Sequence, residues 1–300
     1  MPVQKRRYEG PEDFTKVNQF LINTYEPGGF YPNWLQPRWE YMHTHPYFDE
    51  TSLNKIAIWE EDGNIVAVVN YELELGDTYF AVHPDYTYLK RDMFEHAEKH
   101  LLGTKDNGNK YLRLYIKEFD RELEEIALLQ GYEKDNDYPE FNYISQFKIP
   151  DVFPKISIPE GYKLKSLAED NDHIKVDRVM WRGFNHKGES PQDIEGRKKM
   201  QSGPNYRKDL NIVVEAPDGN FVAYCGMWFV EENKIAYVEP VCTDPDYRRL
   251  GLGKAAVLEG IRRCGELGAT VAFVETGMKF YLDIGFQPVH SYYPWEKEFK

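Results

Sequence analysis

The sequence predicts an α/β protein with mixed (α+β) sheets, arranged as two consecutive domains in a chain of 300 residues. An apolar strand, an Asp-Gly-Asn turn and a second apolar strand occur at residues 55–67 and again at 211–223. Asp-Gly between apolar runs is a strong hairpin signal. Pro-Asp-Tyr recurs at 84–86 and 245–247, and a Gly-aromatic pair recurs at 131–132 and 285–286. Three landmarks in one order, 154 to 161 residues apart, indicate a duplicated domain.

The boundary between the two domains is predicted near residues 149–160. This stretch contains three prolines and has no helical periodicity, as is typical of a linker. We therefore expect domains at residues 1–150 and 158–300. Each half gives the order helix, hairpin, strand, helix, strand, helix, strand.

The elements of the second half follow from the spacing of its apolar residues. Helices are expected at 172–184, 189–200, 253–267 and 278–282. Strands are expected at 211–215, 221–229, 235–242 and 270–274, with a last strand pair from 286 onward. Gly268 is suited to end the long helix, and the strand after it is expected to be parallel.

Composition excludes several classes of protein. The chain has 37 Lys and Arg against 50 Asp and Glu, a net charge of −13. This acidic balance argues against a nucleic-acid partner and against an anionic membrane surface, and it is compatible with a cationic acceptor. No apolar run is long enough for a membrane span, and no signal peptide is evident.

The cysteines and histidines predict neither a disulfide framework nor a metal site. Cys225, Cys242 and Cys264 form no Cys-x-x-Cys pair and indicate reduced thiols in a cytoplasm. His96 and His100 lie four residues apart on an expected helix, but no third ligand is evident. We expect them to be a surface pair and expect no metal.

The most informative segment spans residues 241–255, Val-Cys-Thr-Asp-Pro-Asp-Tyr-Arg-Arg-Leu-Gly-Leu-Gly-Lys-Ala. A strand is expected to end in a turn, and a glycine-containing loop then begins a helix. Glycines let a backbone approach a ligand closely, and the free N–H groups of a helix start bind anions. Arg248 and Arg249 would add charge-assisted contacts to phosphates. The segment is neither a Walker loop nor a Rossmann fingerprint.

Arg248-Arg-Leu-Gly-Leu-Gly253 resembles the acetyl-CoA motif of the GNAT superfamily of N-acetyltransferases, Gln/Arg-x-x-Gly-x-Gly/Ala. Phe280-Tyr-Leu-Asp-Ile-Gly-Phe286 resembles a second landmark of that family. The resemblance covers residues 158–300 well and, through the repeat, reaches 1–150 weakly. It implies tandem GNAT-like domains.

The resemblance also implies which residues hold the acetyl-CoA cosubstrate. Strand residues Val241, Cys242 and Thr243 would pair with the pantetheine arm. The backbone of the following loop would hold the pyrophosphate, through Arg248, Arg249, Leu250, Gly251, Leu252, Gly253, Lys254 and Ala255. The reaction would be direct attack of a neutral amine on the acetyl carbon, which needs a base and an acid.

Tyr281 and Glu239 are the candidate catalytic residues. Tyr281 matches the family's tyrosine, and a phenol with a pKa near 10 suits protonation of a thiolate. Strand alternation is expected to place Glu239, Val241 and Thr243 on one face. Glu239 is then a candidate base, an acceptor-binding carboxylate or an ordinary strand residue, and the sequence does not choose among these. Cys242 is expected to pack rather than to act as a nucleophile.

The first half departs from the motif. Residues 86–94 read Tyr-Thr-Tyr-Leu-Lys-Arg-Asp-Met-Phe, without glycines, and Ala127 stands where the catalytic tyrosine would be. We expect this domain to have lost acetyl-CoA binding.

The leading hypothesis is an acetyl-CoA-dependent N-acetyltransferase acting on a primary amine of a small molecule. One alternative is a non-catalytic acyl-CoA-binding or regulatory protein. A second is an aminoacyl-tRNA-dependent transferase, against which the net charge counts. The sequence identifies neither the acceptor nor the oligomeric state.

Overall fold

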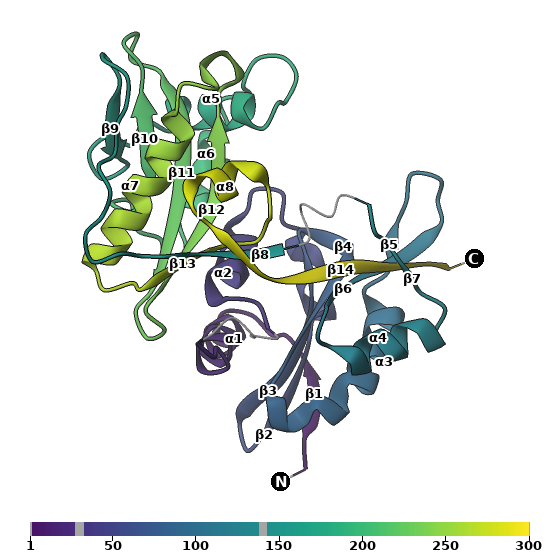
Figure 1. The fold of residues 1–300 in the computed structure, drawn as a ribbon. Coiled ribbons are helices and arrows are strands. Elements are labelled where there is room, and N and C mark those ends of the chain that lie inside the picture. Colours follow the sequence, from purple (N-terminus) through teal and green to yellow (C-terminus); the bar gives the residue numbers. More distant parts are fainter. Residues whose placement is uncertain (1, 28–32, 138–142, 300) are drawn as a thin grey trace. The chain divides into compact units, whose positions relative to one another are not determined.

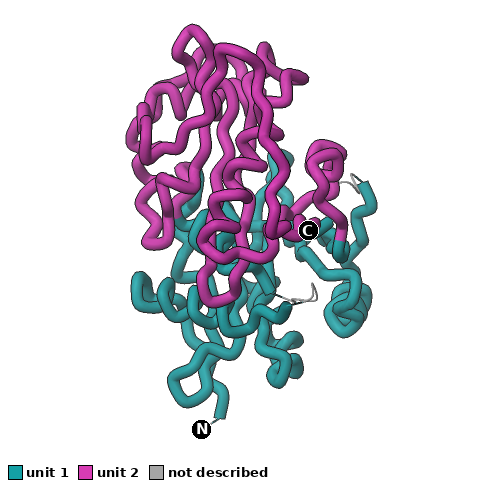
Figure 2. The backbone as a smooth tube through the Cα atoms, turned by 60° about the vertical axis from the view of Figure 1, so that its left-hand side comes forward, with its two compact units in different colours: residues 1–43, 47–144, 289–300 teal, residues 44–46, 145–288 magenta. Residues whose placement is uncertain are grey.

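The computed structural model describes residues 2–27, 33–137 and 143–299. The chain divides into two compact units (Figure 2). Unit 1 comprises residues 1–43, 47–144 and 289–300, and unit 2 comprises residues 44–46 and 145–288. The neighbours of the described strands confirm a mixed sheet in each unit.

Unit 1 contains a sheet with helices on both faces (Figure 1). Its strands lie in the order β1 (Gln4–Arg7), β2 (Ala57–Glu61), β3 (Asn64–Glu72), β4 (Glu74–Val82), β6 (Lys110–Lys117) and β14 (Gln287–Phe299). Two short strands, β5 (Gly103–Thr104) and β7 (Glu133–Lys134), pair with β6 and β14. The helices are α1 (Pro11–Asn23), α2 (Gln36–Thr44), α3 (Lys90–His100) and α4 (Arg121–Leu129), with 3₁₀ turns η1 (Glu50–Lys55) and η2 (Pro84–Leu89).

Unit 2 repeats this plan around a second apolar core. Its strands lie in the order β8 (Tyr143–Lys148), β13 (Val271–Val274), β12 (Ile235–Thr243), β11 (Phe221–Val230), β10 (Ile212–Glu215) and β9 (Lys163–Ser166). The helices are α5 (His173–Gly183), α6 (Ile194–Met200), α7 (Leu252–Glu266) and α8 (Lys279–Ile284), with a 3₁₀ turn η4 (Pro245–Tyr247). The expected parallel strand is confirmed, because β13 runs parallel to β12. The second expected helix begins five residues later than predicted, at Ile194.

The last strand of each half lies in the sheet of the other half. Strand β8 precedes residues 149–160 yet pairs antiparallel with β13, and β14 returns to pair antiparallel with β6. The apolar side chains follow the strands: Phe147 belongs to the core of unit 2 and Trp295 to that of unit 1. The division therefore differs from the predicted domains 1–150 and 158–300, and the last strand pair expected in the second half is wrong. A repeat predicts the elements of each half but not which sheet an end strand joins.

Candidate active site

The glycine-containing segment forms a loop between β12 and α7. Gly251 is the N-cap of α7 and has a left-handed backbone, with φ of 81°. A Cβ on this residue would meet no atom within 4 Å, so the space directly beside the backbone is open. The first turn of a helix has N–H groups without intrahelical partners, and these point along the helix axis into that region. The geometry is that of an anion-binding helix start with an accessible backbone.

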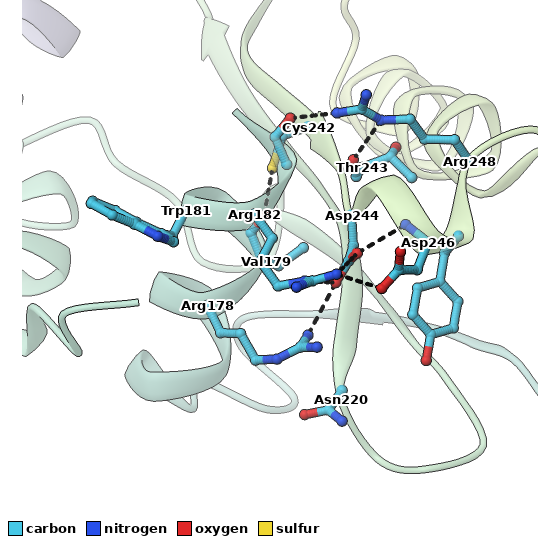
Figure 3. Close-up of polar contacts among 12 residues, drawn as sticks. Arg178, Val179, Trp181, Arg182, Asn220, Cys242, Thr243, Asp244, Asp246 and Arg248 are labelled. Atoms are coloured by element: carbon cyan, nitrogen blue, oxygen red, sulfur yellow. Dashed lines mark hydrogen bonds and ion pairs between the residues drawn. The ribbon is translucent and has the colours of Figure 1, made fainter. Parts of the chain in front are cut away.

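Asp244 anchors the start of this loop (Figure 3). Its carboxylate is fully buried, accepts hydrogen bonds from Arg182 Nε at 2.6 Å and Nη2 at 2.9 Å, and caps η4 through the Asp246 N–H at 3.1 Å. Arg178 Nη1 lies 3.3 Å away. Burial alone would raise the pKa of Asp244, but the hydrogen bonds and the two guanidinium charges outweigh it and lower the pKa. Asp244 therefore stays ionised and fixes the loop to α5.

Strand β12 has an open edge beside the loop. Its parallel partner β13 pairs with it only at Ile235, Ala236 and Tyr237, so the two strands part before the loop begins. The Asp244 N–H donates to Val222 C=O at 2.9 Å. Antiparallel pairing alternates, which directs the N–H and C=O of Thr243 and of Val241 away from β11. An extended polar ligand could pair with this edge as an additional strand.

The side chains of Arg248, Arg249 and Leu250 in the predicted cofactor loop differ in their contacts and in their exposure. The Arg248 guanidinium donates to Thr243 C=O at 3.1 Å, Gly183 C=O at 2.9 Å and Asn185 Oδ1 at 2.8 Å. It thus contacts neutral protein groups instead of projecting freely toward a phosphate. Arg249 is exposed and has a left-handed φ of 68°, and Leu250 is 45% exposed.

The residues that begin α7 divide into buried and exposed positions. Leu252, Gly253 and Ala255 are buried, and Lys254 is exposed and donates to Asp283 C=O at 3.4 Å. A Cβ at Gly253 would lie 2.7 Å from Thr243 Oγ1, so this glycine lets the helix start lie against the end of β12.

Tyr281 lies in α8, packed edge-on against Phe280 and Phe286. It is 9% exposed, and no hydrogen bond from its hydroxyl is found in the described part of the chain. Burial raises the pKa of Tyr281 well above the usual value, and the negative charge of Glu239 adds to the effect. The phenol is therefore protonated at neutral pH and has a proton to donate.

The alternation expected to place Glu239 with Val241 and Thr243 is wrong. Cys225 faces Val241 and Met227 faces Val238, so Glu239 and Pro240 stand opposite the single residue Gly226. This bulge reverses the alternation, and it fits because a Cβ at Gly226 would lie 2.4 Å from the Glu239 carbonyl oxygen. The sequence markers of this bulge are Pro240 within the strand and the glycine opposite it, and simple alternation takes account of neither.

Cys242 is a packing residue, as expected. Its side chain lies against α5, where its thiol contacts Val179 C=O at 3.5 Å and a Cβ on Gly183 would come within 2.7 Å of its Cβ. Burial raises the pKa of the Cys242 thiol to about 12. A thiol with this pKa is a poor nucleophile at neutral pH.

The matching region of unit 1 is built differently. Strands β4 and β6 are paired in parallel at Asp77 and Thr78, and Val82 ends β4 as Thr243 ends β12. The outward N–H and C=O of Val82 are both taken by the buried Asn33, whose Oδ1 accepts at 2.8 Å and whose Nδ2 donates at 3.3 Å. In unit 1 a side chain thus takes both outward groups at the strand end, whereas among the described residues of unit 2 only the Thr243 C=O has a side-chain partner, Arg248.

The glycine loop is also missing from unit 1. Turn η2 leads directly into α3, whose first residue, Lys90, stands where the repeat places Gly251. Lys90 is 8% exposed, with its Nζ 2.6 Å from Asp120 and 3.3 Å from Glu122. Two carboxylates here would repel a phosphate.

Sequence reasoning did not single out Arg182, Arg178 or Asn33. Arg182 and Arg178 lie one helical turn apart on α5, but nothing local links them to Asp244, 62 or more residues away. The expected surface pair of histidines is wrong, because His96 is buried, bonds to Lys55 C=O at 2.8 Å and has a pKa lowered to about 4 by burial. Within the described ranges, no group of three or more His, Cys, Asp or Glu is placed to hold a metal ion.

Comparison with known proteins gives the family of this domain. Residues 180–286 match the model of the acetyltransferase (GNAT) family, so unit 2 contains a GNAT acetyltransferase domain. The mycothiol acetyltransferase of Saccharomonospora viridis is 26% identical over 153 residues. That match spans 46% of this chain and only half of the relative's length.

Solved structures extend the fold to the whole chain. A tandem GNAT protein from the clavulanic acid biosynthesis pathway has a TM-score of 0.65 at 14% identity, covering 99% of this chain and 98% of that one. A GCN5-related N-acetyltransferase from Sphaerobacter thermophilus has a TM-score of 0.60 at 17% identity, with coverage of 99% and 95%. The tandem GNAT fold expected from the repeat is confirmed.

Proposed function

We propose that the protein is an acetyl-CoA-dependent N-acetyltransferase that acetylates a primary amine of a small molecule at a site in unit 2. The observation that carries the proposal is the open edge of β12 leading straight to the glycine-capped start of α7. An extended ligand ending in a diphosphate has the shape and polarity to fill these two adjoining features.

Binding would depend mainly on backbone groups. The N–H and C=O of Val241 and the N–H of Thr243 would pair with the pantetheine amides, and the N–H groups of residues 249–254 would hold the pyrophosphate. Acetyl-CoA supplies the activated acetyl group. A backbone N–H on the β12 edge, directed at the thioester carbonyl, would stabilise the negative charge that develops on its oxygen.

Glu239 and Tyr281 would handle the two protons of the reaction. Glu239 would accept a proton from the ammonium form of the acceptor, directly or through water, which frees the nitrogen lone pair for attack on the acetyl carbon. The second nitrogen proton, released once the C–N bond has formed, would return to the Tyr281 oxygen after the phenol has protonated the departing sulfur. Tyr281 would donate its hydroxyl proton to the sulfur as the thioester bond breaks. A high pKa favours this role, because the phenol must carry its proton when the thiolate forms.

Unit 1 is proposed to bind no acetyl-CoA, since Asn33 and Lys90 occupy the corresponding positions. Among the described residues, no helix is long and apolar enough to cross a membrane. All three cysteines are free and buried, which supports the proposed cytoplasmic location.

The proposal is tested by incubating the protein with acetyl-CoA and a panel of amines and measuring free thiol release. We expect turnover with at least one amine. Tyr281→Phe should lower kcat about 100-fold, the smallest contribution typical of a general acid, with little change in acetyl-CoA affinity. Unchanged kcat in this variant would remove Tyr281 from the mechanism, and coenzyme A binding without any turnover would favour the non-catalytic alternative.

A further inference from the structure

Arg248 joins three segments of unit 2 that are separate in the sequence. Its own backbone belongs to the loop before α7, its Nε donates to the end of β12, and its Nη2 donates to Gly183 C=O and Asn185 Oδ1 at the end of α5 (Figure 3 shows Arg248 beside Thr243). Because one planar guanidinium holds all three acceptors, these segments cannot move independently without breaking a hydrogen bond.

The partners of Arg248 distinguish it from the other arginines here. Arg182 and Arg178 face the carboxylate of Asp244, whereas Arg248 has no carboxylate within 4 Å among the described residues. Its three acceptors are neutral, so its positive charge is not cancelled locally. The charge therefore adds to the anion-attracting field of the α7 start even though the side chain is committed to protein groups.

The α5 end held by Arg248 leads into an exposed segment. Residues 184–193 connect α5 to α6 and contain two left-handed residues, Asn185 with φ of 62° and Gln192 with φ of 56°. The Trp181 ring stacks on His186 at 4.5 Å, and the Trp181 indole donates to Gly188 C=O at 3.2 Å. Arg182 ties α5 itself to Asp244 and Asp246, and among the described residues Arg248 is the cofactor-loop side chain that bonds directly to this segment, through Asn185.

We propose that Arg248 is a positioning residue that couples occupancy of the cofactor loop to the order of the segment 184–190. This inference rests on the proposed function for the site of binding. A ligand on the N–H groups of the loop and on the edge of β12 would fix two of the segments that Arg248 joins. The third segment, the end of α5, would then become less mobile because the same guanidinium holds it. Binding at the cofactor loop would in this way be coupled to the order of residues 184–190.

The test uses hydrogen exchange of the full chain with and without coenzyme A, together with calorimetry of coenzyme A binding. In the wild-type protein, coenzyme A should slow amide exchange in both 248–255 and 184–190, the latter by about 5-fold or more, the lower end of typical couplings. In Arg248→Ala, coenzyme A should slow exchange in 248–255 only. Arg121→Ala, an exposed arginine of α4 paired with Glu124, is the matched control and should behave as wild type.

Two further variants distinguish the coupling through the hydrogen bonds of Arg248 from the attraction of its positive charge for the ligand. Arg248→Lys keeps the positive charge but offers a point donor that cannot hold three acceptors, so it should retain most of the coenzyme A affinity and lose the slowing in 184–190. Asn185→Ala removes one acceptor and should reduce that slowing partly. If Arg248→Lys slows 184–190 as wild type does, or if wild type binds coenzyme A without any slowing there, the coupling is refuted. Absence of coenzyme A binding to wild type would instead refute the proposed function.

Discussion

Replacing Gly251 with tryptophan should abolish coenzyme A binding while leaving unit 2 folded. The residue has φ of 81°, and a Cβ there meets only open space, so the indole would enter the region proposed for the pyrophosphate. Left-handed backbone costs a non-glycine residue about 1–2 kcal/mol. Each lost hydrogen bond to a charged group costs about 1.5–3 kcal/mol. Loss of two such bonds weakens binding by about 100- to 10,000-fold, at about 1.4 kcal/mol per factor of ten.

Unit 2 offers a matched control for this substitution. Gly219 has φ of 83°, and a Cβ there also meets nothing within 4 Å, but it lies in the Asp-Gly-Asn turn between β10 and β11. Gly219→Trp therefore carries the same backbone cost without filling the loop. Calorimetry should give one coenzyme A site per chain for wild type and Gly219→Trp, and none for Gly251→Trp. Undiminished affinity in Gly251→Trp, or two sites in wild type, would refute the reasoning.

The remaining predictions concern stability. Arg182→Ala should lower the free energy of unfolding by about 1.5–3 kcal/mol at pH 7, the value of a hydrogen bond to a charged group. Asp244 has a lowered pKa when folded, so its contribution is present above its unfolded pKa of about 3.9 and is lost as pH falls through the folded value. Urea unfolding should thus show the difference between Arg182→Ala and wild type shrinking below about pH 4, and a difference independent of pH would contradict this account. Asn33→Ala leaves the N–H and C=O of Val82 without partners and should cost about 2–4 kcal/mol in urea unfolding, whereas the exposed Asn64→Ala should change stability by less than about 0.5 kcal/mol. Equal changes in the free energy of unfolding for the two asparagine variants would show that the hydrogen bonds between Asn33 and Val82 do not stabilise the protein.

Local signals in the sequence predict much of unit 2. The Asp-Gly turn, the apolar period of α7 and the glycines of its N-terminus depend on neighbouring residues, and the structure has these elements where they were expected. The parallel β13 also follows from local order, because a strand, a helix and a strand in succession give a parallel pair.

Features that depend on distant residues could not be predicted in this way. The buried position of His96 depends on packing against the carbonyl of Lys55, 41 residues away. The bulge at Glu239 depends on the missing side chain of Gly226 in the neighbouring strand. The contacts of Arg248 combine a loop, a strand end and a helix end, and sequence alone suggested only that a basic residue near glycines would attract phosphate.

The path of β14 has a consequence for how the protein is made. This strand follows all the others in the described sequence, yet it supplies Trp295 to the core of unit 1. During translation the other strands of unit 1 are synthesised before unit 2, and β14 is synthesised after it. The edge of β6 that pairs with β14 therefore stays unpaired while unit 2 is synthesised. Unpaired strand edges are templates for wrong partners. Unit 1 is therefore translated first but completes its sheet last. We expect chaperones that act during synthesis to bind mainly at the unpaired edge of β6.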